Sequence, residues 1–139
     1  PIQWHPTPNA GFSSAKPFSA LVKGALGYHH VIVSRQINDP ASLFRAIKRM
    51  IAIRKKHAAF GGSNMEWVET GNPSVAVYLR QHDGDTILIL NNLNSSLETV
   101  QIPKEHQRAY LNLFTGDSQT LSTQLSLQPY SYIWLEQLK

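Results

Sequence analysis

The sequence predicts a mainly β protein, in which an antiparallel β-sandwich follows one long α-helix and a loop-rich segment. Two observations support this prediction. Residues 63–139 contain short apolar runs separated by turn residues about every ten positions, which is typical of an antiparallel sandwich. Residues 40–60 instead repeat their apolar side chains with the period of a helix. The hydrophobic share of 42% in 139 residues is enough to build a core.

Residues 1–37 form the loop-rich segment, because Pro, Gly, Ser and aromatic residues are frequent there and no period persists. One strand is expected within it, at residues 28–34, where β-branched residues gather in a run of strand length. His29 and His30 would then point to opposite faces of that strand and could not bind one ion together. We therefore predict no metal site.

The helix at residues 40–60 has a start, an end and an apolar stripe. Asp39 is a candidate cap for the first-turn amides, Pro40 suits the first helical position, and Gly61 supplies the end. The apolar stripe should pack against the sandwich, and it contains Leu43, Ile47, Met50 and Ile51. Basic side chains occupy the other side of the helix, as expected for a solvated face: Arg45, Lys48, Arg49, Lys55 and Lys56.

Residues 63–139 supply the strands of the sandwich. Asp83-Gly84 between two apolar runs is the strongest hairpin signal in the chain. The run Thr-Ile-Leu-Ile-Leu at residues 86–90 predicts a central strand. Residues 120–127 alternate apolar and polar side chains, so one face of that strand should contact water.

The composition excludes several classes of function. The chain has no cysteine, which rules out disulfides, thiolate metal sites and cysteine nucleophiles, and favours a cytoplasmic location. No apolar run approaches the ~18–20 residues of a membrane span, so no membrane partner is predicted. The net charge of +4 comes largely from the solvated helix face, which lacks aromatic residues for base stacking. Nucleic acid is therefore not a predicted partner.

The nine acidic residues contain no evident catalytic pair. Asp39 suits a helix cap, Asp83 and Asp85 belong to a hairpin turn, and Glu66 and Glu69 lie in an edge-like strand. A nucleophile elbow, a phosphate-binding loop and a dinucleotide fingerprint are all absent from the sequence. We predict no catalytic residue in this chain.

The opening segment, Pro-Ile-Gln-Trp-His-Pro-Thr-Pro-Asn-Ala-Gly-Phe, is the best candidate for binding. It combines flat apolar rings with carboxamide groups, a mixture that suits the C–H faces and hydroxyl rims of sugars. The alternative is that these aromatic side chains simply pack the loop onto a neighbouring element. Composition alone favours neither interpretation. The candidate substrate-binding residues are Gln3, Trp4, Asn9 and Phe12.

Three motifs identify a family resemblance. Pro-Ile-Gln-Trp is followed by Asn-Ala-Gly-Phe at residues 9–12, residues 27–43 contain Gly-Tyr, Gln and Asp-Pro-Ala-Ser-Leu, and the helix ends in His-Ala-Ala-Phe-Gly. Together they resemble the α-amylase superfamily, glycoside hydrolase family 13, in the branch of trehalose synthases and oligo-1,6-glucosidases. Ile32 and Ser34 depart from the Asn and Glu of trehalose synthases. The resemblance covers essentially the whole chain.

The resemblance implies that residues 1–61 are the C-terminal end of a (β/α)8 catalytic barrel, including its last helix, and that residues 63–139 are its C-terminal sandwich. It implies a retaining mechanism on an α-glucoside such as maltose or trehalose, with the catalytic carboxylates upstream of this fragment. The expected partners are the upstream barrel, the sugar and a second copy in a homodimer. Calcium occurs in the family, but no ligands for it are identified here.

An alternative from another class is a stand-alone carbohydrate-binding module for α-glucans. It requires an exposed aromatic platform on the sandwich, for which the candidates are Trp67, Tyr78, Tyr130, Tyr132 and Trp134. Tyr130, Tyr132 and Trp134 would share one face of the last strand by its period of two. We favour a core position for these three, because a terminal strand must bury side chains to stay docked.

Overall fold

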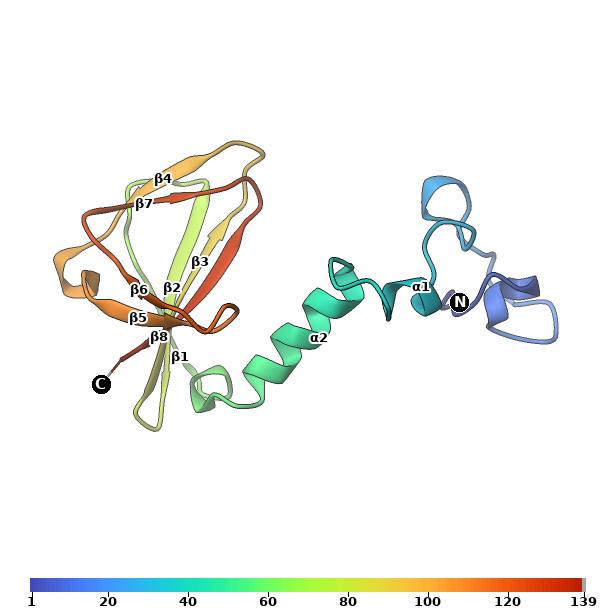
Figure 1. The fold of residues 1–139 in the computed structure, drawn as a ribbon, viewed down its shortest axis with the longest axis horizontal. Helices are drawn as coiled ribbons and strands as arrows, with labels where there is room; N and C mark the ends of the chain where they lie inside the picture. The colour runs from blue at the N-terminus through green and yellow to red at the C-terminus, as the bar shows by residue number, and fades with distance from the viewer. Residues whose placement is uncertain (139) are drawn as a thin grey trace. The chain divides into compact units, whose positions relative to one another are not determined.

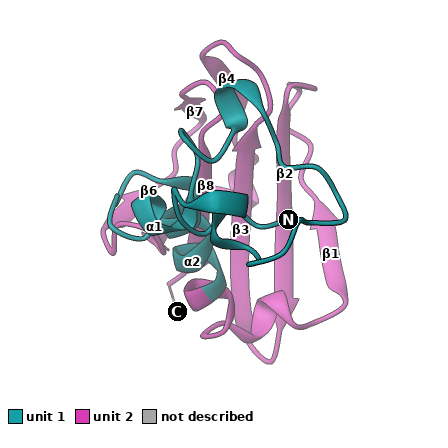
Figure 2. Cartoon of the chain, turned by 90° about the vertical axis from the view of Figure 1, so that its right-hand side faces the viewer, with its two compact units in different colours: residues 1–51 teal, residues 52–139 magenta. Residues whose placement is uncertain are grey.

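The structure of the chain is a computed structural model that describes residues 1–138. It divides into two compact units, Pro1–Ile51 and Ala52–Lys139, which Figure 2 shows in teal and magenta. None of the helices in residues 1–138 is long and apolar enough to cross a bilayer.

Unit 2 is an antiparallel sandwich of two sheets, as the sequence predicts (Figure 1). The larger sheet has six strands in the order β1-β2-β3-β8-β5-β6, and the smaller sheet pairs β4 with β7. Every pairing is antiparallel. The strands are β1 (Asn64–Trp67), β2 (Val75–His82), β3 (Asp85–Asn92), β4 (Glu98–Gln101), β5 (Ala109–Asn112), β6 (Ser118–Thr120), β7 (Gln124–Leu127) and β8 (Tyr132–Gln137).

The main core lies between the two sheets. Leu88 and Leu90 of β3 and Leu135 of β8 point into it, while Val100 of β4 and Leu127 of β7 close it from the smaller sheet. All five are at most 1% exposed. Burial alternates along β2, which matches the period of two expected for a strand with one covered face.

Strand β3 is buried on both faces, which confirms the central strand predicted at residues 86–90. Leu88 and Leu90 face the main core, whereas Ile87 and Ile89 point to the other face of the sheet. There a short 3₁₀ helix, η3 (Ala58–Phe60), covers them through Ala59, and all of these side chains are at most 1% exposed. The Asp83-Gly84 hairpin forms as predicted, with positive φ angles of 49° and 76°.

Helix α2 (Leu43–Arg54) is shorter than the predicted helix at residues 40–60. Its cap is Ser42, whose Oγ accepts a hydrogen bond from the Arg45 amide at 3.2 Å. Asp39 instead accepts the Ala41 amide at 2.9 Å in a local turn before the helix, so the expected cap at Asp39 is wrong. The chain leaves helical geometry after Arg54 and resumes as η3.

The apolar stripe of α2 is open rather than buried. Leu43, Ile47 and Ile51 are 72%, 45% and 49% exposed, and Ile53 is the one buried residue of this helix. The spacing that predicted one apolar face on this helix is confirmed. The packing of Ile47 against the sandwich stays a prediction.

Residues 28–34 do not form the predicted strand. Gly27 O accepts the amides of His30 and Val31 at 2.9 and 3.0 Å, which makes a turn, and helix α1 (Val33–Gln36) follows. The β-branched composition is overridden because the amides of Val33 and Ser34 bond to backbone carbonyls of the opening segment. Unit 1 also contains η1 (Pro8–Gly11) and η2 (Gly24–Leu26), and unit 2 contains η4 (Lys104–His106).

Truncating the core should destabilise unit 2. We expect Leu135→Ala to lower the free energy of unfolding by about 2–5 kcal/mol, because it removes a fully buried side chain between the sheets. Urea denaturation followed by circular dichroism measures this change. Leu93→Ala is the control; its side chain is 66% exposed and should cost less than about 0.5 kcal/mol. Equal midpoints for the two variants would contradict the assigned core.

Candidate functional site

Gln3 fastens the opening segment to residues 26–33 of unit 1. Its side-chain Nε2 donates to the carbonyl oxygens of Leu26 and Val31 at 3.0 and 2.9 Å. Its backbone carbonyl accepts the Val33 amide at 2.9 Å. The side-chain oxygen Oε1 is buried and has no hydrogen-bond partner among residues 1–138. The side-chain NH₂ group of Gln3 therefore donates only to backbone carbonyls of unit 1, and its side-chain oxygen is the one acceptor without a partner among residues 1–138.

The motif Asn-Ala-Gly forms a turn of three successive left-handed residues. Asn9, Ala10 and Gly11 have φ angles of 54°, 57° and 67°. The carbonyl of Ala10 accepts the amides of Trp4 and His5 at 2.9 and 3.1 Å, which closes the turn onto the start of the chain. A side chain at Gly11 would place its Cβ 3.1 Å from that of His5. Consecutive left-handed residues with side chains are strained and are characteristic of functional loops.

Trp4 and Phe12 are the exposed aromatic side chains of this turn, at 41% and 47%. The amide of Phe12 donates to Asn9 O at 3.0 Å, so these three predicted site residues surround one turn. The carboxamide of Asn9 donates to the carbonyls of Ser13 and Ala15, both at 3.0 Å. The turn thus presents two rings on a hydrogen-bonded base, and sugar binding by Gln3, Trp4, Asn9 and Phe12 stays a prediction.

The aromatic face expected on the last strand is only partly formed. Tyr130 lies in the turn before β8 with a φ of 53°, so it does not share the strand's alternation and is 67% exposed. Tyr132 and Trp134 lie on β8. Trp134 packs against Phe60 and Phe114 with ring centroids 4.7 and 5.0 Å apart, which occupies much of its surface. The expected common face of three aromatic residues is wrong for Tyr130.

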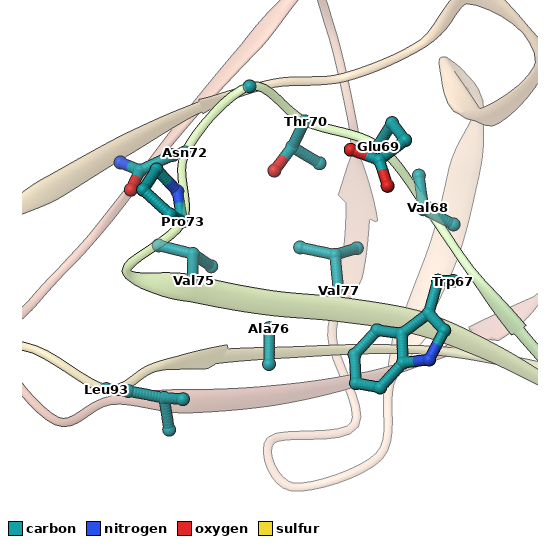
Figure 3. Close-up of a pocket in the computed structure, with 11 residues that line it drawn as sticks. Trp67, Val68, Glu69, Thr70, Asn72, Pro73, Val75, Ala76, Val77 and Leu93 are labelled. Atoms are coloured by element: carbon teal, nitrogen blue, oxygen red, sulfur yellow. The ribbon is translucent and has the colours of Figure 1, made fainter.

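A pocket of about 470 Å³ opens beside the connection between β1 and β2 (Figure 3). The ring of Trp67, which is 59% exposed, lines it. Figure 3 shows Val75 and Val77 pointing to one side of β2, and Ala76 and Leu93 to the other side. The lining groups therefore do not converge on one ligand position.

Asn72, one of the polar residues that line this pocket, is engaged in structural hydrogen bonds. Its Nδ2 donates to the carboxylate of Glu98 at 2.8 Å, and its Oδ1 accepts the Ser74 amide at 2.9 Å. Hydrogen bonds from the side chains of Asn72, Ser96 and Asn94 lower the pKa of Glu98 below its usual 4.5. This cluster fixes the turn before β4 and leaves Asn72 with no free carboxamide for a ligand.

One side-chain cluster was missed from the sequence. Asp85, which the sequence placed in a hairpin turn, begins β3, and its Oδ2 lies 3.5 Å from Nδ1 of His57. Oε1 of Glu136 on β8 lies 3.9 Å from the same nitrogen. The three residues are far apart in the chain, and no local pattern in the sequence signals their approach.

Two known families match successive parts of the chain. Residues 65–134 match the family described as maltogenic amylase, C-terminal domain, and residues 1–62 match the family described as α-amylase, catalytic domain. The chain belongs to the α-amylase family. The boundary between the two matches, at residues 62–65, falls at the start of β1.

Trehalose synthases and a trehalulose synthase are among the proteins that the chain resembles. The trehalose synthase/amylase of Mycobacterium tuberculosis is 34% identical over 117 residues, which are 79% of this chain and 20% of that protein. The trehalose synthase of Thermus thermophilus is 33% identical over 111 residues, 76% of the chain and 11% of that protein. The chain thus spans about a fifth or less of these curated relatives. The crystal structure of the trehalulose synthase from Pseudomonas mesoacidophila matches with a TM-score of 0.80 and 25% identity over 98% of the chain and 24% of its own.

Removing the Gln3 side chain should loosen the opening segment. In Gln3→Ala we expect amide exchange at Val33 and Ser34 to accelerate about thirtyfold, because two hydrogen bonds of about 1 kcal/mol each are lost. Hydrogen exchange measured by NMR tests this. Thr7→Ala in the same segment removes a side chain that makes no capping bond and should leave both rates unchanged. Unchanged exchange in Gln3→Ala would contradict the anchoring role.

Glu98 should make the stability of unit 2 sensitive to acid. Its folded-state pKa is lowered, so its contribution is present above the unfolded value and is lost as the pH falls below about 4.5 through the folded value. In Asn72→Ala we expect a smaller loss of stability on acidification than in the wild type. The substitution removes the Asn72 hydrogen bond, which is the largest of the three that lower the pKa of Glu98. Urea midpoints between pH 7 and pH 3 measure this, with Asn64→Ala on exposed β1 as the control. If the urea midpoint falls equally with pH in the wild type, Asn72→Ala and Asn64→Ala, Glu98 is not the group that makes unit 2 sensitive to acid.

Proposed function

We propose that the chain is the end of the catalytic barrel and the C-terminal domain of a trehalose synthase, which interconverts maltose and trehalose. The observation that supports this is the 34% identity to a trehalose synthase/amylase over 117 residues, a length that exceeds either family match alone. The enzyme breaks one glucosidic bond and re-forms another with retention at the anomeric carbon. The cytoplasmic location expected from the sequence is part of the same proposal.

In this mechanism the chain's own residues shape the substrate side of the barrel. Trp4 and Phe12 offer apolar ring surface for the C–H faces of a sugar, and the left-handed turn holds both rings in place. The freed glucose must stay bound while it reorients, so a rigid wall that keeps water out favours isomerisation over hydrolysis. The nucleophile and the general acid are supplied by the upstream part of the barrel.

The upstream barrel is also the proposed partner of α2. Leu43, Phe44, Ile47 and Ile51 line an open apolar groove of about 480 Å³ on this helix. The last helix of a barrel packs its apolar face against neighbouring barrel elements, which would bury this groove. A homodimer of the whole enzyme is a further part of the proposal.

The proposal is tested by joining this chain to the barrel strands expected upstream. We expect the joined protein to convert maltose to trehalose, as measured by chromatography of the sugars. Trp4→Ala should lower kcat/KM about tenfold or more, because it removes one ring of the binding wall. Phe18→Ala is the matched control, since Phe18 is another aromatic residue of unit 1 and is 107% exposed.

Three outcomes would contradict parts of this proposal. Glucose as the sole product would identify a hydrolase instead of a synthase. Equal kcat/KM for Trp4→Ala and Phe18→Ala would remove Trp4 from the substrate wall. Saturable chemical-shift changes at Tyr132 when the present chain is titrated with maltose would favour a carbohydrate-binding module.

A further inference from the structure

We propose that His57, Asp85 and Glu136 form a binding site for a Zn²⁺ ion. Each offers one ligand atom, and these atoms all lie within 4.8 Å of one another. They come from three segments of unit 2: the residue before η3, the start of β3, and β8. An imidazole with two carboxylates is a donor set that suits zinc, whereas Mg²⁺ and Ca²⁺ prefer oxygen alone.

The spacing of the donor atoms suits a tetrahedral ion. With zinc–ligand bonds of about 2.0–2.2 Å, two ligands of a tetrahedral site lie about 3.3–3.6 Å apart. His57 Nδ1 and Asp85 Oδ2 are 3.5 Å apart, which is longer than a normal hydrogen bond. His57 Nδ1 and Glu136 Oε1 are 3.9 Å apart, and the ligand oxygens of Asp85 and Glu136 lie within 4.8 Å of each other, so the Glu136 side chain has to move toward the other two ligands. Its side chain is 34% exposed and has room to do so.

The backbone around the cluster holds the three groups in place. Ile87 pairs with Glu136, and Asp85 lies two residues before Ile87 on the same face of the sheet. The amide of Ala59 donates to Asp85 Oδ2 at 3.1 Å, which fixes the segment that carries His57. The rings of His57 and Phe60 contact edge to face with centroids 6.5 Å apart. Such supporting contacts orient metal ligands in known sites.

The two carboxylates of the cluster also lack a cationic partner from Lys or Arg among residues 1–138, which favours a bound cation. Oδ1 of Asp85 is buried and has no hydrogen-bond partner among residues 1–138. The guanidinium of Arg80 donates to backbone carbonyls of residues 59, 60 and 62, and within residues 1–138 neither carboxylate forms an ion pair with Lys or Arg. The side chains of His57 and Asp85 are only 15% and 16% exposed. A bound Zn²⁺ would satisfy both carboxylates and tie the segment after α2 to β3 and β8.

The chain itself provides a matched control. Nε2 of His82 lies 3.5 Å from Asp83 Oδ2, the same separation as in the His57–Asp85 pair. The His82–Asp83 pair is 49% and 77% exposed and belongs to none of the three-residue groups able to hold an ion in the described part of the chain. A pair that lacks a third ligand should bind zinc weakly.

The experiment titrates the chelator-treated 139-residue chain with Zn²⁺ in a calorimeter and repeats thermal unfolding with Zn²⁺ or Mg²⁺. We expect one equivalent of Zn²⁺ to bind and to raise Tm in a concentration-dependent way, with no rise in Mg²⁺. Glu136→Gln should weaken binding about tenfold or more, since loss of a supporting group alone costs that much. His57→Ala should abolish this site, and His82→Ala should bind as the wild type does.

Glu136→Gln preserves the shape of a half-exposed side chain, so an unchanged Tm without metal shows that it still folds. The proposal is overturned if the wild-type chain takes up no Zn²⁺. It is equally overturned if His57→Ala and Glu136→Gln bind zinc as the wild type does, because the ion then lies at other residues. Loss of binding in His82→Ala would also place the site elsewhere.

Discussion

The structure of unit 2 depends on burying β3 on both faces. One face closes the main core with Leu88 and Leu90, and the other places Ile87 and Ile89 under η3. A strand that is apolar on both faces has no side to turn to water, so the sheet requires a second cover besides the small sheet. The segment between α2 and β1 supplies that cover. This segment is therefore part of the fold of the sandwich.

The segment that covers β3 also places polar and aromatic groups against residues of β3 and β8. Placing Ala59 over β3 sets its amide on Asp85 and lays Phe60 against Trp134. His57 is thereby held beside two carboxylates of the outer sheet face. A single packing requirement thus explains the aromatic contacts of β8 and the mixed histidine–carboxylate cluster.

The opening segment of unit 1 is held mainly by hydrogen bonds, although Ala10 within it is fully buried. The carboxamides of Gln3 and Asn9 bind backbone carbonyls, and a left-handed turn is closed by the carbonyl of Ala10. Sugar binding by Gln3, Trp4, Asn9 and Phe12 stays a prediction. In the structure the carboxamide donors of Gln3 and Asn9 hold the segment together, and the rings of Trp4 and Phe12 are exposed.

By itself the sequence determined the antiparallel sandwich, the central strand, the Asp-Gly hairpin and the family, because these depend on period, turn chemistry and motifs that are local in the chain. Tertiary structure alone decided the rest. Residues 28–34 became a turn and a helix because the distant carbonyls of Gln3 and Trp4 accept the amides of Val33 and Ser34. The approach of His57, Asp85 and Glu136 was invisible in the sequence, since it arises from strand pairing and from the cover over β3.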